Sequence, residues 1–201
     1  QAEELGADAE RIAAIEGLAD VHALQAQWEE ASRLYQEALD YHQQKGDAVR
    51  QARVQSRIGS TFSGIFDFRQ AIPHIQAAME TLQTQKDEPE LASVYLQMAR
   101  TQTAIGNFTR AEEFARKGLE LAEHYDLSPQ MADGQWALGF IDTLLGRPEA
   151  VTHYGKCIEI AERVNDLGWA IQGYAWNAFR HRWRGEYHQA LEAYTRALAL
   201  A

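Results

Sequence analysis

The 201-residue sequence has few of the residues that mark several classes of protein. Its one cysteine, Cys157, excludes an internal disulfide framework and fits a reducing compartment. Four prolines and no Ser/Gly-rich tract argue against linkers and disordered tails. There is no run of about 18 apolar residues and no basic-then-apolar leader. We therefore expect a folded cytoplasmic chain with no membrane span.

Basic residues are also scarce. The chain has 19 Lys and Arg against 29 Asp and Glu, a formal net charge of -10. Clustered Lys and Arg supply the affinity for a phosphate backbone, so nucleic acid is not an expected partner. β-Branched residues are few beside Ala, Leu, Gln, Glu and Arg, which favour helices. The composition predicts an all-α chain.

The sequence repeats about every 40 residues, five times. A small residue precedes an aromatic or Pro by two places at Ala26/Trp28, Phe66/Phe68, Gly106/Phe108, Gly146/Pro148 and Gly185/Tyr187. Phe66 is the one large residue in the small slot. An Ala follows each pair, at Ala31, Ala71, Ala111, Ala150 and Ala190, and a large side chain stands eight places further on, at Leu39, Met79, Leu119, Ile158 and Leu198.

A second set of positions recurs upstream of each pair. Large and small residues stand together at Leu18-Ala19, Ile58-Gly59, Met98-Ala99, Leu138-Gly139 and, as a polar variant, Asn177-Ala178. Small residues let two helices approach closely while a bulky neighbour fills the remaining space. Each unit is thus predicted to be an antiparallel helix hairpin. Asp47, Asp87, Asp126 and Asp166 mark the joints between units, where Asp can cap a helix.

The clearest units resemble the tetratricopeptide repeat. The resemblance rests on Leu138-Gly139, Leu145-Gly146, Ala150, Tyr154 and Cys157-Ile158, and on Gly185 to Ala190 with Tyr194 and Ala197-Leu198. HEAT-type repeats share the length, but this spacing favours tetratricopeptide. A period longer than the usual unit of about 34 residues is similar to the long-helix variant of large bacterial signalling ATPases, regulators and cyclases, and of some eukaryotic scaffold proteins. The resemblance implies a right-handed superhelical solenoid of about five hairpins.

We expect residues 1–201 to form a single array. Its units are placed at about 8–46, 47–86, 87–125, 126–165 and 166–201, with residues 1–6 as the tail of a preceding helix. The last helix stops with an apolar face and no polar cap, whereas terminal units of an array normally carry a solubilising surface. We therefore expect a fragment of a longer protein, or an end covered by another copy.

The resemblance implies that the first helices form a concave wall that takes a peptide. In the first two units this wall offers small and polar side chains, among them Glu16, Asp20, Ser56 and Ser60, where a chaperone-tail clamp would need Lys and Asn. The third unit offers Ser93, Leu96 and Arg100. Aromatic residues gather in the last two units. The predicted binding residues are Arg100, Trp136, Phe140, Phe179, Arg182 and Trp183, because desolvated Trp, Phe and Arg carry binding energy.

Two other interpretations of the aromatic residues stay open. They can pack between the first helices instead of binding a partner. Trp169, Trp176 and Trp183, spaced by seven, can form a packing stripe or an oligomer face.

The pattern predicts no catalytic residue, no metal site and no cofactor. His153 and Cys157 share a helix face at i, i+4, but Cys157 occupies the small packing slot that Ala holds elsewhere. There is no Gly-rich phosphate loop and no nucleophile motif.

The sequence favours a non-enzymatic module that binds a protein or peptide, as the sensor or interaction domain of a larger bacterial signalling or regulatory protein. One alternative is a small-molecule effector-sensing domain, since Trp and Phe beside Arg suit a sugar or an anionic metabolite. The other is a self-assembly element that stacks through its exposed helical ends.

Overall fold

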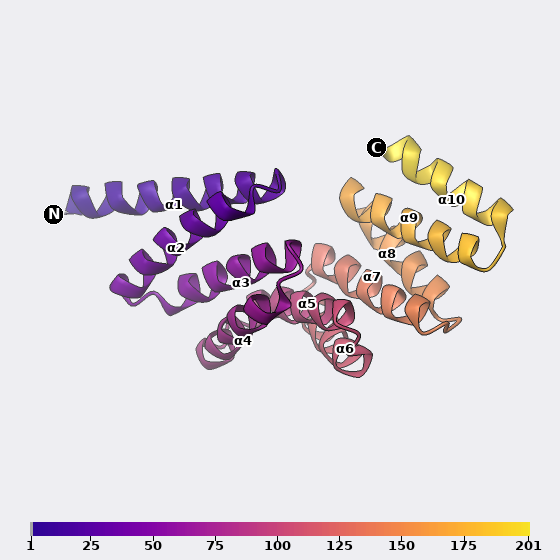
Figure 1. The fold of residues 1–201 in the computed structure, drawn as a ribbon, viewed down its shortest axis with the longest axis horizontal. Coiled ribbons are helices and arrows are strands. Elements are labelled where there is room, and N and C mark those ends of the chain that lie inside the picture. The colour runs from indigo at the N-terminus through magenta and orange to yellow at the C-terminus, as the bar shows by residue number, and fades with distance from the viewer. Residues whose placement is uncertain (1) are drawn as a thin grey trace. The chain divides into compact units, whose positions relative to one another are not determined.

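The computed structural model describes residues 2–201, with side chains described from Asp8 onward. Within that range the chain forms ten α-helices and no strand, so the predicted all-α class is confirmed (Figure 1). The helices are α1 (Ala2–Leu24), α2 (Trp28–Lys45), α3 (Ala48–Gly64), α4 (Phe68–Gln85), α5 (Glu88–Ala104), α6 (Phe108–His124), α7 (Ser128–Leu144), α8 (Ala150–Arg163), α9 (Leu167–Trp183) and α10 (Tyr187–Leu200).

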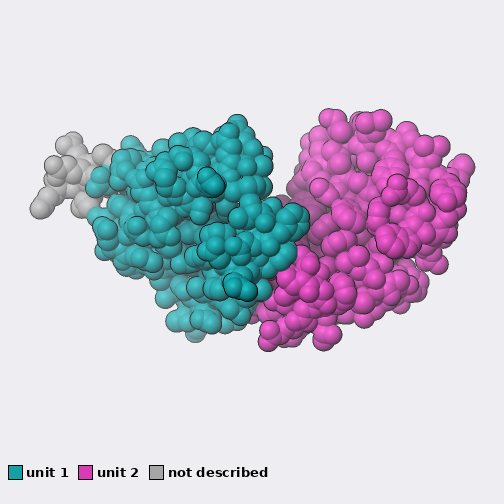
Figure 2. Space-filling view, viewed as in Figure 1, with its two compact units in different colours: residues 1–90 teal, residues 91–201 magenta. Residues whose placement is uncertain are grey.

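The helices pack in consecutive pairs, and the chain divides into two compact units (Figure 2). Unit 1 covers residues 1–90 and holds the hairpins α1/α2 and α3/α4. Unit 2 covers residues 91–201 and holds α7/α8, α9/α10 and the hairpin of α6 with nearly all of α5. The arrangement of residues 1–201 as a single array stays a prediction.

The N-terminal helix differs from the expectation. Gln1 lies outside the described residues, and α1 runs without a break from Ala2 to Leu24. Residues 2–6, predicted as the tail of a preceding helix, are instead the first turns of α1. The physical reason is that no proline or capping turn separates them from Ile12, and a lone Gly6 is tolerated inside a helix.

The recurring small residue is the turn residue of each hairpin. Ala26, Phe66, Gly106, Gly146 and Gly185 have φ values of 58°, 60°, 80°, 70° and 76°. This left-handed conformation is easily adopted by Gly and strained for residues with a Cβ atom. In four hairpins the aromatic residue two places later is the first residue of the second helix, at Trp28, Phe68, Phe108 and Tyr187.

Aspartates stabilise several of the joints between hairpins. The side chains of Asp47 and Asp166 accept hydrogen bonds from the backbone N–H of Arg50 and Trp169, so both cap the helix that follows. Asp126 has a different role, because its φ of 52° makes it the left-handed turn residue after α6. The prediction that aspartates mark the joints is therefore confirmed: Asp47, Asp87 and Asp166 cap the helix that follows, and Asp126 is the turn residue itself.

Close helix approach depends on glycines that face large side chains. Within hairpin α7/α8, a Cβ added to Gly139 would lie 2.9 Å from Cε1 of Tyr154. Between hairpins, a Cβ on Gly173 of α9 would lie 2.7 Å from Cγ1 of Ile158 on α8. Neither site has room for a methyl group, so these contacts hold the helices at a separation that only a small residue permits.

Exchanging the turn residues tests this account. Gly106→Ala should lower the free energy of unfolding by about 1 kcal/mol, because the left-handed conformation places Cβ against the backbone. Phe66→Gly should raise it by a similar amount, since the Phe66 side chain is 79% exposed and loses little packing. Urea unfolding followed by circular dichroism measures both changes. A loss of stability in Phe66→Gly would contradict the strain at this turn.

Candidate functional site

In unit 2 the first helices α7 and α9 lie against each other. Their side chains form a continuous aromatic cluster, here called the aromatic face, made of Trp136, Phe140, Trp169, Trp176, Phe179 and Trp183. Trp136 and Phe140 are one helical turn apart on α7, and the other four residues lie along α9. Four of the predicted binding residues, Trp136, Phe140, Phe179 and Trp183, are thus brought into one cluster.

Trp176 is at the centre of this cluster. Its ring centroid lies 4.6 Å from that of Phe140, 6.0 Å from that of Trp136 and 5.3 Å from that of Phe179. All three contacts are edge-to-face, an arrangement that aromatic quadrupoles favour. Trp176 therefore joins the α7 rings to the α9 rings.

Trp183 at the end of α9 is more exposed than the other rings of the aromatic face. Trp136, Phe140, Trp169, Trp176 and Phe179 are half-buried, whereas Trp183 is 76% exposed and contacts the Phe179 ring at 5.5 Å. The expected packing between first helices is therefore present. The rings also keep part of their surface open, so packing and binding are compatible on this face.

The two predicted arginines lie in different settings. Arg100 on α5 forms an ion pair with Asp133 on α7, one turn before Trp136. This pair neutralises the Arg100 charge and joins the two helices. Arg182 is exposed, and its guanidinium lies 5.6 Å from the centroid of the Phe179 ring, a cation–π distance. Only Arg182 extends the aromatic face directly.

Buried polar atoms without a partner accumulate in the same helices. Among the described residues they are Gln102 Oε1, Asp133 Oδ1, Trp136 Nε1, Asn177 Oδ1 and Arg180 Nη1. Buried polar groups are normally hydrogen-bonded, so each exception needs an explanation, such as a ligand, a water molecule or a functional role. All five belong to α5, α7 or α9, the first helices of unit 2.

Two expectations about the first helices need correction. Leu96, predicted to face the groove, is fully buried, and a Cβ on Gly118 of α6 would lie 2.7 Å from its Cγ. Leu96 therefore packs inside its own hairpin. The sequence pattern assigns Trp169 and Trp176 to a stripe of residues spaced by seven and not to the binding site, but the ring contacts place both in the aromatic face. In the repeat alignment Trp176 corresponds to Ala137 and not to Trp136, so the repeat pattern did not indicate that Trp176 and Trp136 contact each other.

The corresponding positions of unit 1 are engaged in an internal polar network. Glu16 pairs with His42 at 2.8 Å and with Arg57 at 3.1 Å, while Asp20 accepts a hydrogen bond of 2.5 Å from the Tyr35 hydroxyl. These side chains join α1 to α2 and α3. They leave the first helices of unit 1 without the aromatic surface of unit 2.

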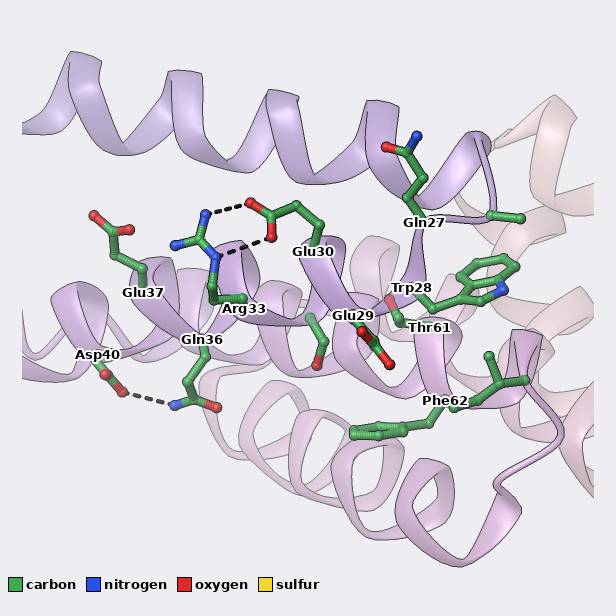
Figure 3. A pocket seen from close by; sticks show the side chains of 13 residues that line it. Gln27, Trp28, Glu29, Glu30, Arg33, Gln36, Glu37, Asp40, Thr61 and Phe62 are labelled. Atoms are coloured by element: carbon green, nitrogen blue, oxygen red, sulfur yellow. Dashed lines mark hydrogen bonds and ion pairs between the residues drawn. The ribbon is translucent and has the colours of Figure 1, made fainter.

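A cavity of about 1070 Å³ lies in unit 1, and none of the predicted binding residues lines it (Figure 3). It is lined by Trp28, Phe62 and many polar side chains of α2. The polar groups bind one another: Arg33 pairs with Glu30 at 2.6 Å, and Gln36 donates to Asp40 at 2.8 Å. We regard it as an acidic surface groove and not as the candidate site.

Cys157 is a packing residue, as its slot predicts. Its side chain is fully buried, and its Sγ lies 3.7 Å from the Trp169 carbonyl oxygen. Burial raises the pKa of the thiol to about 12. His153 instead hydrogen-bonds Gln135 at 2.8 Å. In the part of the chain that is described, no group of three or more His, Cys, Asp and Glu residues is arranged to hold a metal ion.

Native Cys157 should therefore be chemically inert. Because the thiolate is the reactive species, a thiol with a pKa of about 12 and no exposed surface should resist Ellman's reagent at pH 8. Absorbance should show one thiol per chain only after denaturation in guanidinium chloride. Rapid labelling of the folded protein would contradict the burial of Cys157.

Comparison with known proteins identifies the class to which this helical-hairpin fold belongs. Sequence profiles described as tetratricopeptide repeat match residues 10–84 and residues 92–125. The chain belongs to the tetratricopeptide repeat family, whose members are generally non-catalytic scaffolds. A search of curated protein sequences found no match.

Solved structures share the fold. BtubC from P. vanneervenii aligns with a TM-score of 0.77 at 19% identity, covering 98% of this chain and 84% of its own. The Pyrococcus horikoshii signal transduction ATPase with numerous domains (STAND), which has a tetratricopeptide repeat sensor, aligns at 0.78 and 17%, covering 95% and 29%. A Rap protein complexed with competence and sporulation factor aligns at 0.70 and 15%, covering 96% and 64%. These tetratricopeptide-type neighbours confirm the predicted fold class.

Among the described residues, no helix is both long and apolar enough to cross a membrane.

Proposed function

We propose that this chain is a non-catalytic interaction scaffold that binds a protein or peptide through the aromatic face of unit 2. The main supporting observation is the continuous series of ring contacts from Trp169 to Trp183. Every ring in this series keeps part of its surface exposed to solvent. Half-buried aromatic side chains lose little conformational entropy when a partner covers them, and Trp and Arg supply most of the binding energy in many interfaces. Arg182 beside Phe179 adds a cation at the exposed end.

The setting that we propose is a larger bacterial signalling or regulatory protein in the cytoplasm. The Pyrococcus horikoshii protein supports the signalling part of this setting, because it is a signal transduction ATPase with a tetratricopeptide repeat sensor and this chain spans 29% of its length. The Rap complex supports a peptide as the ligand class, since that protein is bound to a competence and sporulation factor. The unpartnered indole N–H of Trp136 supports a site that is completed by a partner.

A peptide selection tests the aromatic face. Peptides selected from a random displayed library against the wild-type chain should bind Trp183→Ala about tenfold more weakly, because the variant removes an exposed aromatic anchor. The double variant Trp136→Ala, Phe140→Ala should bind more weakly still. Fluorescence anisotropy with labelled peptides measures these affinities.

Tyr187 provides the matched control. It is an aromatic residue with 71% exposure on α10, outside the aromatic face, so Tyr187→Ala should keep the wild-type affinity. Thermal unfolding shows whether each variant remains folded. Unchanged peptide affinity in folded Trp183→Ala and in the folded double variant would refute the proposed site.

Self-association is a second candidate function, supported by the exposed ends of α10 and α1. Leu119 and Ile158 each pack against a glycine on the next first helix, Gly134 and Gly173 respectively. Leu198 is the periodic equivalent of these two residues, and it is 78% exposed. The periodic equivalent of the glycines on α1 is Ala14, which is also exposed. We propose that Leu198 of one copy packs against Ala14 of the next, a head-to-tail contact.

Complementary variants test this contact. Leu198→Asp and Ala14→Arg should each be monomeric in sedimentation velocity, whereas the wild type should grow with concentration. An equimolar mixture of the two variants should form dimers and nothing larger, because each supplies one intact end. A wild type that stays monomeric at all concentrations would remove the head-to-tail model.

A further inference from the structure

A second cavity, of about 360 Å³, lies in unit 2 at the exposed end of the aromatic face. Its walls come from the end of α7 and the turn after it, including Thr143, Leu144 and Arg147, and from the end of α9. Phe179 and Trp183 contribute apolar surface, and Arg180 and Arg184 contribute charge. The pocket therefore combines an apolar rim with three arginines.

Arg180 occupies a position that belongs to the core in three of the other four hairpins. The repeat pattern aligns it with Ile141, Thr101 and Thr61, which are at most 2% exposed, and with Val21 of the first hairpin, which is 46% exposed. Arg180 is itself only 8% exposed. Hairpin α9/α10 thus places an arginine where the three hairpins before it bury an aliphatic or hydroxyl side chain. Burying a cation is costly unless an anion pairs with it.

The carboxylates around the pocket are already used by the other two arginines. Arg147 pairs with Glu112 at 2.9 Å and with Asp142 at 3.2 Å. Arg184 lies 3.4 Å from Glu186, which also pairs with His181 at 2.6 Å. By contrast, Nη1 of Arg180 is buried and has no hydrogen-bond partner in the described part of the chain. Burial and the neighbouring Arg184 both lower the pKa of the Arg180 guanidinium.

We propose that this pocket binds an oxyanion, a carboxylate or phosphate group carried on an apolar body, with Arg180 as the residue that pairs with it. The planar guanidinium offers donors in the geometry that such groups accept. Leu144, Phe179 and Trp183 then cover the apolar part of the ligand. This site goes beyond the proposed peptide surface, because its recognition residue is Arg180 and because it takes a free small acid or an acidic group on a peptide equally well.

Small aromatic acids test the site directly. Phenyl phosphate and benzoate, titrated into the wild-type chain by calorimetry, should bind about tenfold more tightly than the uncharged benzyl alcohol. Arg180→Thr restores the residue that Thr101 and Thr61 occupy, so it should fold with a melting temperature at or above that of wild type. It should lose about tenfold in affinity for both acids. Arg196→Thr removes an exposed arginine on α10 that does not line the pocket, so it should keep the wild-type affinity.

Three results would overturn the proposal. The first is equal binding of the acids to wild type and Arg180→Thr, and the second is no binding of either acid at about 10 mM, which is weaker than millimolar affinity. The third is a lower melting temperature of Arg180→Thr, which would show that Arg180 has a structural role.

A competition experiment distinguishes the two sources of the oxyanion. If phenyl phosphate displaces a peptide bound at the aromatic face, the peptide's own acidic group occupies the pocket. If both bind together, the pocket takes a free acid. If Trp183→Ala does not weaken peptide binding, the proposed peptide surface fails, and the effect of Arg180→Thr on acid binding still tests the oxyanion site separately.

Discussion

The close contact between a small residue on one helix and a large side chain on its neighbour is the constraint on which the rest of the structure depends. Gly139 receives the Tyr154 ring within a hairpin, and Gly173 receives Ile158 between hairpins. Because an added methyl group would clash at either site, these contacts set the separation of the helices. That separation in turn decides which side chains of α7 and α9 reach each other. The aromatic face exists because the two backbones lie close enough for rings to touch.

The unusual residues of unit 2 stand out against this shared packing. Where the second and third hairpins place Thr61 and Thr101 in the core, α9 places Arg180, which lines a cavity together with Trp183. A repeat fold can accept such a change at one end of a compact unit, since each hairpin contacts mainly its neighbours. The cost of the buried cation is then local, and the proposed oxyanion would offset it.

Much of the fold was predictable because the period recurs at residues whose physical roles are local. A left-handed turn favours Gly, as at Gly106, and an N-cap favours Asp, as at Asp47, so both are visible in the sequence. Part of the site was predictable too, since Trp136, Phe140, Phe179 and Trp183 meet as expected. Leu96 was misplaced because most residues of α5 are buried, and periodicity alone does not distinguish the groove side from the hairpin side.

The sequence by itself determined the hairpin units, their turns and the helix class, because these depend on residues close together in the chain and repeated at a constant interval. Only the tertiary structure decided which charges are free and which rings meet. Arg100 is neutralised by Asp133 from the next first helix, while Nη1 of Arg180 has no hydrogen-bond partner among the described residues. Trp176 sits among Trp136, Phe140 and Phe179. Both outcomes depend on the rotation and separation of neighbouring helices, which packing sets and a repeat interval does not encode.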